Sequence, residues 1–336
     1  MQKPFVLSAL LLAVGCSAEP GAGPERDVPA PAPDASQLDP AADGALPWHR
    51  DWTASPAVVR MAAPRRLFAV SDVHGGYDRL VALLSAAGLA EVSSSGHVDW
   101  TGDDAVLVVA GDSINKGTQS IEVLDFWMAL QKSATAVGGR IVVLLGNHEA
   151  EFLADPTIAK AKELRVEIEA RQLTAGKFAS PATRWGRFLR SMPIAAVVGG
   201  WYFSHSGHGA SRTMDALASE FRAAVEADKW NAPVLADDDS PLEANDWWSE
   251  AVVAGDLAAA GARHLVMGHD PHAFGEDGTI GAHFEGRLVH IDTGMSPAVD
   301  YSKGRLLVID APGTDDETVA SLSHKGKLTA LDMTQP

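Results

Sequence analysis

Short apolar runs alternate with segments of helical period along most of the chain. Runs at residues 67–70, 105–110 and 141–145 have the length of buried strands. Apolar positions recur at helical spacing over residues 77–87 and again over residues 120–132. Further strands are predicted at residues 201–204, 264–267 and 288–291, with late hairpins from residues 306–309, 319–323 and 328–331. This alternation predicts an α/β fold with mostly parallel strands covered on both faces.

One segment, residues 157–173, is predicted as a charged helix that interrupts this pattern. It fits either an insertion beside a functional site or a solvated flank, and the sequence leaves both interpretations open. No internal repeat accompanies these elements, and no second segment has the pattern of a membrane span.

The first 15 residues have the pattern of an export signal. Lys3 precedes an apolar run over residues 5–14, which is too short to span a bilayer. Cys16, the only cysteine, directly follows residues 12–15, and this arrangement resembles a bacterial lipoprotein lipobox. We therefore predict a signal peptide over residues 1–15 and a lipid anchor on Cys16 that tethers the protein to a membrane. An ordinary cleaved signal with an incidental cysteine is the alternative.

The segment that follows is rich in proline and alanine. We predict a disordered tether over residues 16–64 and a folded domain over residues 65–333. The protein is accordingly expected to be exported as an envelope lipoprotein. Ser17 rather than Asp after the cysteine favours the periplasmic side of the outer membrane, by analogy with enteric lipoproteins.

The charge balance bears on possible partners. Lys and Arg total 27 while Asp and Glu total 44, which gives a formal net charge of −17. This excess argues against nucleic acid as a partner, because such binding needs a cationic surface. It leaves phosphorylated substrates open, because a bound metal ion can supply positive charge locally. With one cysteine, neither an intrachain disulfide nor a cysteine-rich zinc module is possible.

Polar residues cluster where five of the predicted strands end. They are Asp72, His74, Asp112, Asn115, Lys116, Asn147, His148, His205 and His269. In open α/β sheets, ligands bind at the carboxyl ends of strands. Carboxylate, amide and imidazole donors suit divalent cations such as Mn, Fe or Zn. Two such ions about 3.5–4 Å apart can activate a shared water and hold a phosphoryl group.

The order of these motifs resembles the calcineurin-like metallophosphoesterases, and within them the phosphoprotein-phosphatase branch. The motifs are Asp72-x-His74-Gly75, Gly111-Asp112, Gly146-Asn147-His148-Glu149, His205 with Gly207, and Gly268-His269. Residues 292–296 are similar to the ending of Shewanella-like bacterial phosphatases, whereas residues 115–117 are similar to diadenosine-tetraphosphatase-like relatives. The resemblance implies a four-layer α-β-β-α sandwich.

The resemblance also implies roles for individual residues. Asp72, His74 and Asp112 would hold one metal ion, and Asp112 would bridge to a second ion completed by Asn147, His205 and His269. A hydroxide bridging the ions would attack phosphorus in line. His148 would act as the general acid for the leaving group, and the alternative is that it only orients a ligand. Asn147 would also contact the substrate phosphate.

The second motif departs from the family pattern. Asn115 and Lys116 stand where Asp and Arg are usual. Asn115 can orient His148 but adds no negative charge, so we expect a weaker or more acid-shifted activity. Lys116 can offer a cation to a phosphate oxygen, as a point charge rather than a bidentate fork. A solvated turn residue is the alternative for Lys116.

Several other residues are secondary candidates. We interpret His272 as a lining residue or an outer partner, and His208 as lining the mouth of the site. Arg184, Arg187 and Arg212 are candidate phosphate clamps. The function favoured is hydrolysis of phosphate monoesters, on a protein or a small molecule. Its rivals are a nucleotide or diadenosine-polyphosphate hydrolase and a non-catalytic envelope lipoprotein that retains a phosphate-binding fold.

Overall fold

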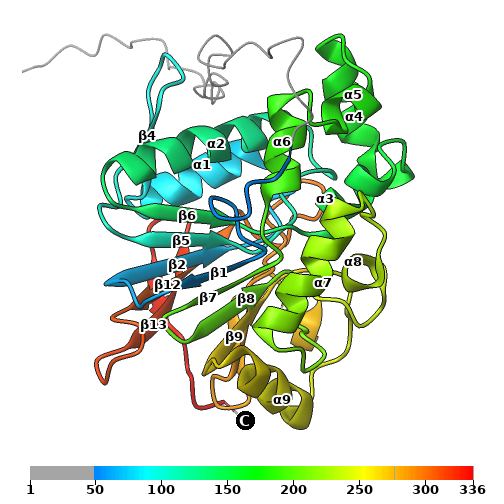
Figure 1. Cartoon of the computed structure of the whole chain (residues 1–336). Coiled ribbons are helices and arrows are strands. Elements are labelled where there is room, and N and C mark those ends of the chain that lie inside the picture. Colours follow the sequence, from blue (N-terminus) through cyan, green and yellow to red (C-terminus); the bar gives the residue numbers. More distant parts are fainter. Residues whose placement is uncertain (1–48, 276, 336) are drawn as a thin grey trace, which may run out of the picture.

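The computed structural model describes residues 49–275 and 277–335. Two six-stranded sheets pack face to face, and helices cover the outer face of each (Figure 1). This arrangement confirms the α/β class and the four-layer sandwich that the sequence predicted.

The first sheet contains the strands that carry most of the predicted site. Its order is β14-β13-β12-β2-β5-β6. These strands span Leu328–Ala330, Thr318–Ser323, Arg305–Asp310, Arg66–Val70, Val106–Val109 and Arg140–Val143. β2, β5 and β6 run parallel, whereas β12, β13 and β14 are antiparallel additions at one edge.

The second sheet has the order β1-β7-β8-β9-β11-β10. Its strands span Val58–Met61, Ala195–Val198, Trp201–Ser204, His264–Met267, Leu288–His290 and Gly281–His283. The central strands β8, β9 and β11 run parallel. A separate hairpin joins β3 (Ala90–Val92) to β4 (Val98–Trp100).

The helices form the two outer layers. They span Tyr77–Ala86 (α1), Ser120–Ala136 (α2), Asn147–Ala154 (α3), Lys162–Ala170 (α4), Ala175–Ala179 (α5), Arg184–Ser191 (α6), Met214–Glu226 (α7), Pro233–Ala236 (α8) and Glu250–Ala260 (α9). Helical turns also occur at η2 (Ala159–Ala161) and η3 (Ala273–Gly275). α1 and α2 cover the first sheet, while α7 and α9 lie against the second (Figure 1).

Each central strand is buried on both faces. In β5, Val106 and Val108 belong to the core between the sheets, whereas Leu107 and Val109 belong to the core beneath the helices. Because side chains alternate along a strand, a strand covered on both sides reads as a continuous apolar run. This explains why the predicted bounds of β2, β5 and β6 agree with the observed bounds to within one or two residues.

The amino-terminal boundary of the folded domain differs from the prediction. Residues 58–61, assigned above to the tether, form β1 and pair in parallel with β7. The guanidinium of Arg50 is buried and donates to the carbonyls of Arg190 and Met192. The folded region therefore begins before residue 65. A four-residue strand between Pro56 and Pro64 has too little periodicity to be recognised without its partner strand.

The predicted signal segment and the Cys16 anchor lie outside the described residues. Within the described part of the chain, no helix has the length and apolarity needed to cross a membrane.

The charged segment 157–173 is split in the structure. η2 leads into α4, and Glu167 on α4 accepts hydrogen bonds from the backbone N–H groups of Ser120 and Ile121 at 3.0 and 2.8 Å. These two groups begin α2, where backbone donors lack partners within the helix. The segment is therefore docked on α2 through a buried carboxylate.

Candidate active site

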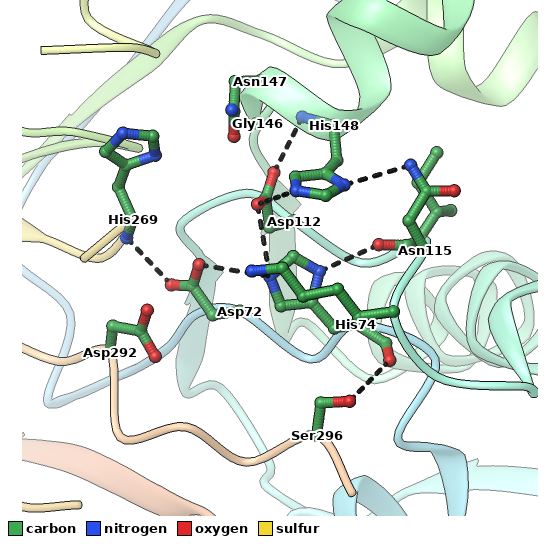
Figure 2. Close-up of polar contacts among 12 residues, drawn as sticks. Asp72, His74, Asp112, Asn115, Gly146, Asn147, His148, His269, Asp292 and Ser296 are labelled. Carbon is green, nitrogen blue, oxygen red and sulfur yellow. Dashed lines mark hydrogen bonds and ion pairs between the residues drawn. The ribbon is translucent and has the colours of Figure 1, made fainter. Parts of the chain in front are cut away.

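The predicted site residues come together at one edge of the two sheets. Figure 2 shows Asp72 and His74 after β2, Asp112 after β5 and His269 after β9, with Asn147 and His148 at the start of α3. His205 directly follows β8. The carboxyl ends of parallel strands deliver these side chains to one place, as the sequence predicted.

Asp112 occupies the centre of this arrangement. Its Oδ2 lies 3.4 Å from Nε2 of His74, and its Oδ1 lies 3.4 Å from Nε2 of His205. Two groups of atoms that could bind a metal ion include Asp112, namely His74–Asp112–His148 and Asp72–Asp112–His205, and within each group the atoms lie within 4.8 Å of one another. Asp112 belongs to both groups, which is the position that a bridging ligand requires.

Backbone carbonyls fix the orientation of two imidazoles. Nδ1 of His74 donates to the carbonyl of Ile114 at 2.9 Å, and Nδ1 of His205 donates to the carbonyl of Ala110 at 2.8 Å. With Nδ1 donating to a carbonyl, Nε2 is the nitrogen that faces Asp112 in both rings. Metal-ligating histidines are commonly oriented in this way. Nδ1 of His269 lies 3.1 Å from Nε2 of His205.

The amide of Asn147 is oriented by a residue that sequence reasoning missed. Its Nδ2 donates to Oε2 of Glu243 at 3.2 Å, which leaves Oδ1 facing Nε2 of His205 at 3.0 Å. Glu243 lies 96 residues further along the chain and belongs to no recognisable motif. The amide oxygen, the better metal donor of the two amide atoms, therefore points into the site.

The buried carboxylates provide a test of whether the site fits cations. Asp72 and Asp112 are each about 2% exposed, and Oδ1 of Asp72 accepts no hydrogen bond from any described residue. Asp292, also buried, lies beside Asp72 (Figure 2). Burial, and then the charge of Asp72, raise the pKa of Asp292 well above its usual value. Buried carboxylates that lie close together among imidazoles fit divalent cations, which would offset this charge.

The pKa of Asp112 shifts in the opposite direction. Burial would raise it, but the surrounding imidazoles of His205, His148 and His74 lower it well below its ordinary value. The pKa of His74 falls to about 3 because burial disfavours the charged ring. A deprotonated Asp112 beside a neutral His74 is the protonation state that metal ligation needs.

The backbone at the ligands is held in an uncommon conformation. Asp72, His74, Asp112 and His269 have φ angles of 53°, 45°, 55° and 74°. Residues other than glycine rarely adopt this left-handed backbone conformation. Where they do, they are often found at functional sites. A Cβ at Gly146 would collide with Oδ1 of Asp112, so only glycine permits the close approach there.

Glu149 holds two of the ligand-bearing loops together. Its carboxylate accepts from the backbone N–H groups of Asp112, Ser113, Ile114 and Gly146 at 2.8–3.1 Å. Burial, and then the charge of Asp112, raise the pKa of this fully buried carboxyl group to about 7. The last residue of the Gly-Asn-His-Glu motif is therefore a positioning residue that ties the β5 loop to the β6 loop.

His148 is placed beside Asp112 but is turned toward Asn115. Its backbone N–H donates to Oδ1 of Asp112 at 3.1 Å, while its ring Nδ1 accepts from Nδ2 of Asn115 at 3.1 Å. This bond places the proton of the neutral ring on Nε2, which lies 3.8 Å from Oδ2 of Asp112. Burial lowers the pKa of His148.

Lys116 faces the site rather than solvent. Its Nζ lies 2.9 Å from Nε2 of His74. The solvated-turn alternative is therefore wrong, and a cation stands at the edge of the cluster where the sequence predicted one.

The side chains of the secondary candidates bind residues outside the cluster around Asp112. The side chain of His272 is 61% exposed and bonds to Asp277 and to the hydroxyl of Tyr301. His208 pairs with Asp256 and stacks on Trp247. Among the candidate clamps, Arg184 is bound to Asp125, Arg187 to the carbonyl of Pro181 and Arg212 to Glu220.

Comparison with known proteins identifies the family. The pattern described as calcineurin-like phosphoesterase matches residues 65–293, more than half of the chain. The chain therefore belongs to this family and is a metal-dependent phosphoesterase. The resemblance stated from the motifs is confirmed.

Individual relatives are similar over most of their length. The chain is 26% identical over 291 residues to an uncharacterized protein of Schizosaccharomyces pombe, covering 80% of this chain and 83% of that protein. It is 23% identical over 259 residues to Shewanella-like protein phosphatase 1 of Plasmodium berghei, covering 71% and 69%. Its fold is similar to the crystal structure of a cold-active protein-tyrosine phosphatase of a psychrophilic Shewanella species. That similarity has a TM-score of 0.68 at 22% identity and covers 87% and 88% of the two chains.

Proposed function

We propose that the protein hydrolyses phosphate monoesters, with phosphorylated protein as the favoured substrate class, at a centre of two divalent metal ions. The observation that carries the proposal is the convergence on Asp112 of a second carboxylate, three imidazoles and an oriented amide. The similarity to a protein phosphatase over more than two thirds of the chain supports the substrate class.

Six side chains would hold the ions. Asp72, His74 and Asp112 form one half of the ligand set, while Asn147, His205 and His269 complete the other half with Asp112. When bound, divalent ions supply Lewis acidity that activates water and offsets charge on phosphoryl oxygens.

The remaining residues act on the substrate itself. In its imidazolium form His148 would deliver the proton from Nε2 to the leaving oxygen. The amide of Asn115, offering its oxygen to Nδ1–H, would keep the ring turned so that Nε2 faces the site. Lys116 would bind a phosphate oxygen through Nζ, because its ammonium group already lies at the edge of the cluster. Asn147 would contact the same phosphate.

A substrate panel tests the proposal. The purified protein, loaded in turn with Mn, Fe and Zn, would be offered p-nitrophenyl phosphate, phosphotyrosyl and phosphoseryl peptides, nucleotides and diadenosine tetraphosphate. We expect metal-dependent turnover of the monoesters and the phosphopeptides. A strong preference for nucleotides or diadenosine tetraphosphate would instead support the second candidate, which the Asn115–Lys116 variant favours. If none of these substrates shows metal-dependent turnover, the hydrolase proposal is wrong. The remaining hypothesis is then the non-catalytic lipoprotein that retains a phosphate-binding fold.

We also propose that the protein is exported and anchored by a lipid on Cys16, on the periplasmic side of the outer membrane. The support is the pattern of residues 1–17. Fractionation of bacteria that express the full chain would test it. We expect the protein in the outer-membrane fraction and its Cys16→Ser variant in a different fraction, whereas identical distributions would contradict the anchor.

A further inference from the structure

The three antiparallel strands at the edge of the first sheet separate positive from negative charge along their length. Lys303, Arg305, His324, Lys325 and Lys327 lie at one end of β12, β13 and β14. Asp310, Asp315, Asp316 and Glu317 lie at the other end. The five residues of this basic cluster gather positive charge at one place, although the chain as a whole has a formal net charge of −17.

The register of the sheet places the basic end beside the active site. β12 pairs with β2 so that Leu307 lies opposite Ala69, and continuing this register brings Arg305 level with Ser71, directly before Asp72. Arg305 in turn lies opposite Ser323 on β13. Figure 1 shows β2, β12 and β13 as successive strands. Strands lie about 4.8 Å apart, so the β13–β14 turn lies roughly 10–15 Å from Asp72 along the sheet.

The basic residues line an open groove. Arg305, His324, Lys325 and Lys327 contribute to a groove of about 640 Å³ between β10 and the β13–β14 hairpin. Asp332 is the only carboxylate among the described lining residues, and it already accepts hydrogen bonds from Thr334 and Gln335. The groove therefore presents mainly positive charge.

The lysines of the cluster are available to a ligand. Lys303, Lys325 and Lys327 form no ion pair with any residue that the structure describes, whereas Arg305 donates to the carbonyl of Gly278. Partial burial and then the charges of Lys325, Lys303 and Arg305 lower the pKa of His324.

We propose that this groove binds an acidic segment that flanks the phosphorylated residue of a protein substrate. The inference rests on the proposed function, because it assigns a substrate to the same site. β10 and β14 are the outer strands of their sheets, so an extended chain can lie between them. A segment that leaves the phosphorylated residue in extended form reaches the lysines after roughly three to five residues at about 3.3 Å per residue. A concave groove between strand edges fits such a chain better than it fits the flat surface of a membrane.

The experiment compares peptides and variants. Two phosphopeptides of equal length would differ only in carrying Glu or Ala at these flanking positions. They would be tested on the metal-loaded full chain, on Lys325→Glu/Lys327→Glu, and on the control Lys132→Glu/Arg140→Glu. Lys132 and Arg140 are exposed and lie toward the opposite end of the first sheet. p-Nitrophenyl phosphate has no flanking peptide segment, so its turnover would measure the activity of the metal site without the groove.

We expect the unmodified chain to prefer the Glu peptide by about tenfold in kcat/KM, as electrostatic steering of charged ligands gives. Added salt and the Lys325→Glu/Lys327→Glu variant should abolish this preference, while the control variant keeps it. Turnover of p-nitrophenyl phosphate should be unchanged in both variants. Equal kcat/KM for the two peptides on the unmodified chain would overturn the inference.

A binding measurement separates this inference from the proposed function. Fluorescence anisotropy of the unphosphorylated Glu and Ala peptides needs no turnover. Tighter binding of the Glu peptide, lost in the lysine variant, supports the groove even if p-nitrophenyl phosphate is not hydrolysed. Equal binding of both peptides would overturn the proposal that the groove binds an acidic segment, even if the protein hydrolyses p-nitrophenyl phosphate. Binding of the chain to phosphatidylglycerol vesicles that depends on the two lysines, with no peptide preference, would assign the cluster to a membrane surface instead.

Discussion

His148, the proposed general acid, is held in one orientation by its neighbours. It follows the proposed ligand Asn147 in the first turn of α3, yet its ring is turned to Asn115 and to Oδ2 of Asp112. Since it is not needed to complete either half of the proposed ligand set, its removal should affect proton transfer more than metal binding.

We predict that His148→Asn lowers kcat on p-nitrophenyl phosphate by about 10²–10⁴-fold, the usual contribution of a general acid. Elemental analysis should find the metal content retained. The control is His97→Asn, a half-exposed surface histidine paired with Asp99, which should keep full activity. A His148→Asn variant that turned over as fast as the unmodified chain would remove the acid assignment.

Asn115 offers a second test at the same position. A carboxylate in its place would lie near Nδ1 of His148 and would favour the imidazolium form. We predict that Asn115→Asp moves the high-pH limb of the kcat profile upward by about one pH unit, because an acid with a raised pKa keeps its proton to higher pH. A limb that stayed in place or moved to lower pH would show that Asn115 does not tune His148.

The sequence predicted which side chains gather around Asp112, because each of them follows an apolar run within a short motif. It did not predict Glu243 or the burial of Asp292 against Asp72, because those contacts join distant segments. Nor could it show that Glu149 binds four backbone N–H groups, since that requires the two loops to be adjacent in space.

At the scale of elements, the docking of α4 on α2 depends on one buried carboxyl group. Burial raises the pKa of Glu167 to about 7, although the N–H groups of Ile121 and Ser120 act in the opposite direction. The ordinary value for Glu is about 4.3. The folded state therefore binds this proton more tightly than the unfolded state does.

The sign of the pH effect follows from this difference. The stabilising contribution is fully present below the unfolded pKa and is lost as pH rises through the folded pKa near 7. We predict that, between pH 5 and pH 7.5, the free energy of unfolding falls by on the order of 2 kcal/mol more in the unmodified chain than in Glu167→Gln. Urea unfolding at the two pH values measures this, with Glu169→Gln as an exposed control on the same helix. Equal pH dependence in the unmodified chain and Glu167→Gln would contradict the prediction.

The elements themselves were predictable to different degrees. β2, β5, β8 and β9 were predicted from short apolar runs, because both faces of each strand are buried. β1 was assigned to the tether because a strand of four residues gains its stability from pairing with β7. α4 was predicted as a helix, but its contact with the start of α2 depends on tertiary packing.

The whole molecule should be stabilised by the ions that it binds. Buried carboxylates that repel one another in the folded state destabilise it until a cation joins them. We predict that a divalent ion at about a hundredfold excess over its Kd adds roughly 2.7 kcal/mol per site to the free energy of unfolding and raises Tm. A chelator should reverse the change. A Tm indifferent to Mn, Fe and Zn would show that the folded state binds none of them.

The central claim is that dispersed side chains converge on Asp112 to hold two ions in one chain. Elemental analysis of protein loaded with Mn, Fe or Zn and then separated from free metal tests it most directly. We predict two ions per chain in the unmodified protein and loss of both in Asp112→Asn, because this residue faces both halves of the ligand set. A metal-free chain, or an Asp112→Asn variant that keeps both ions, would contradict the account.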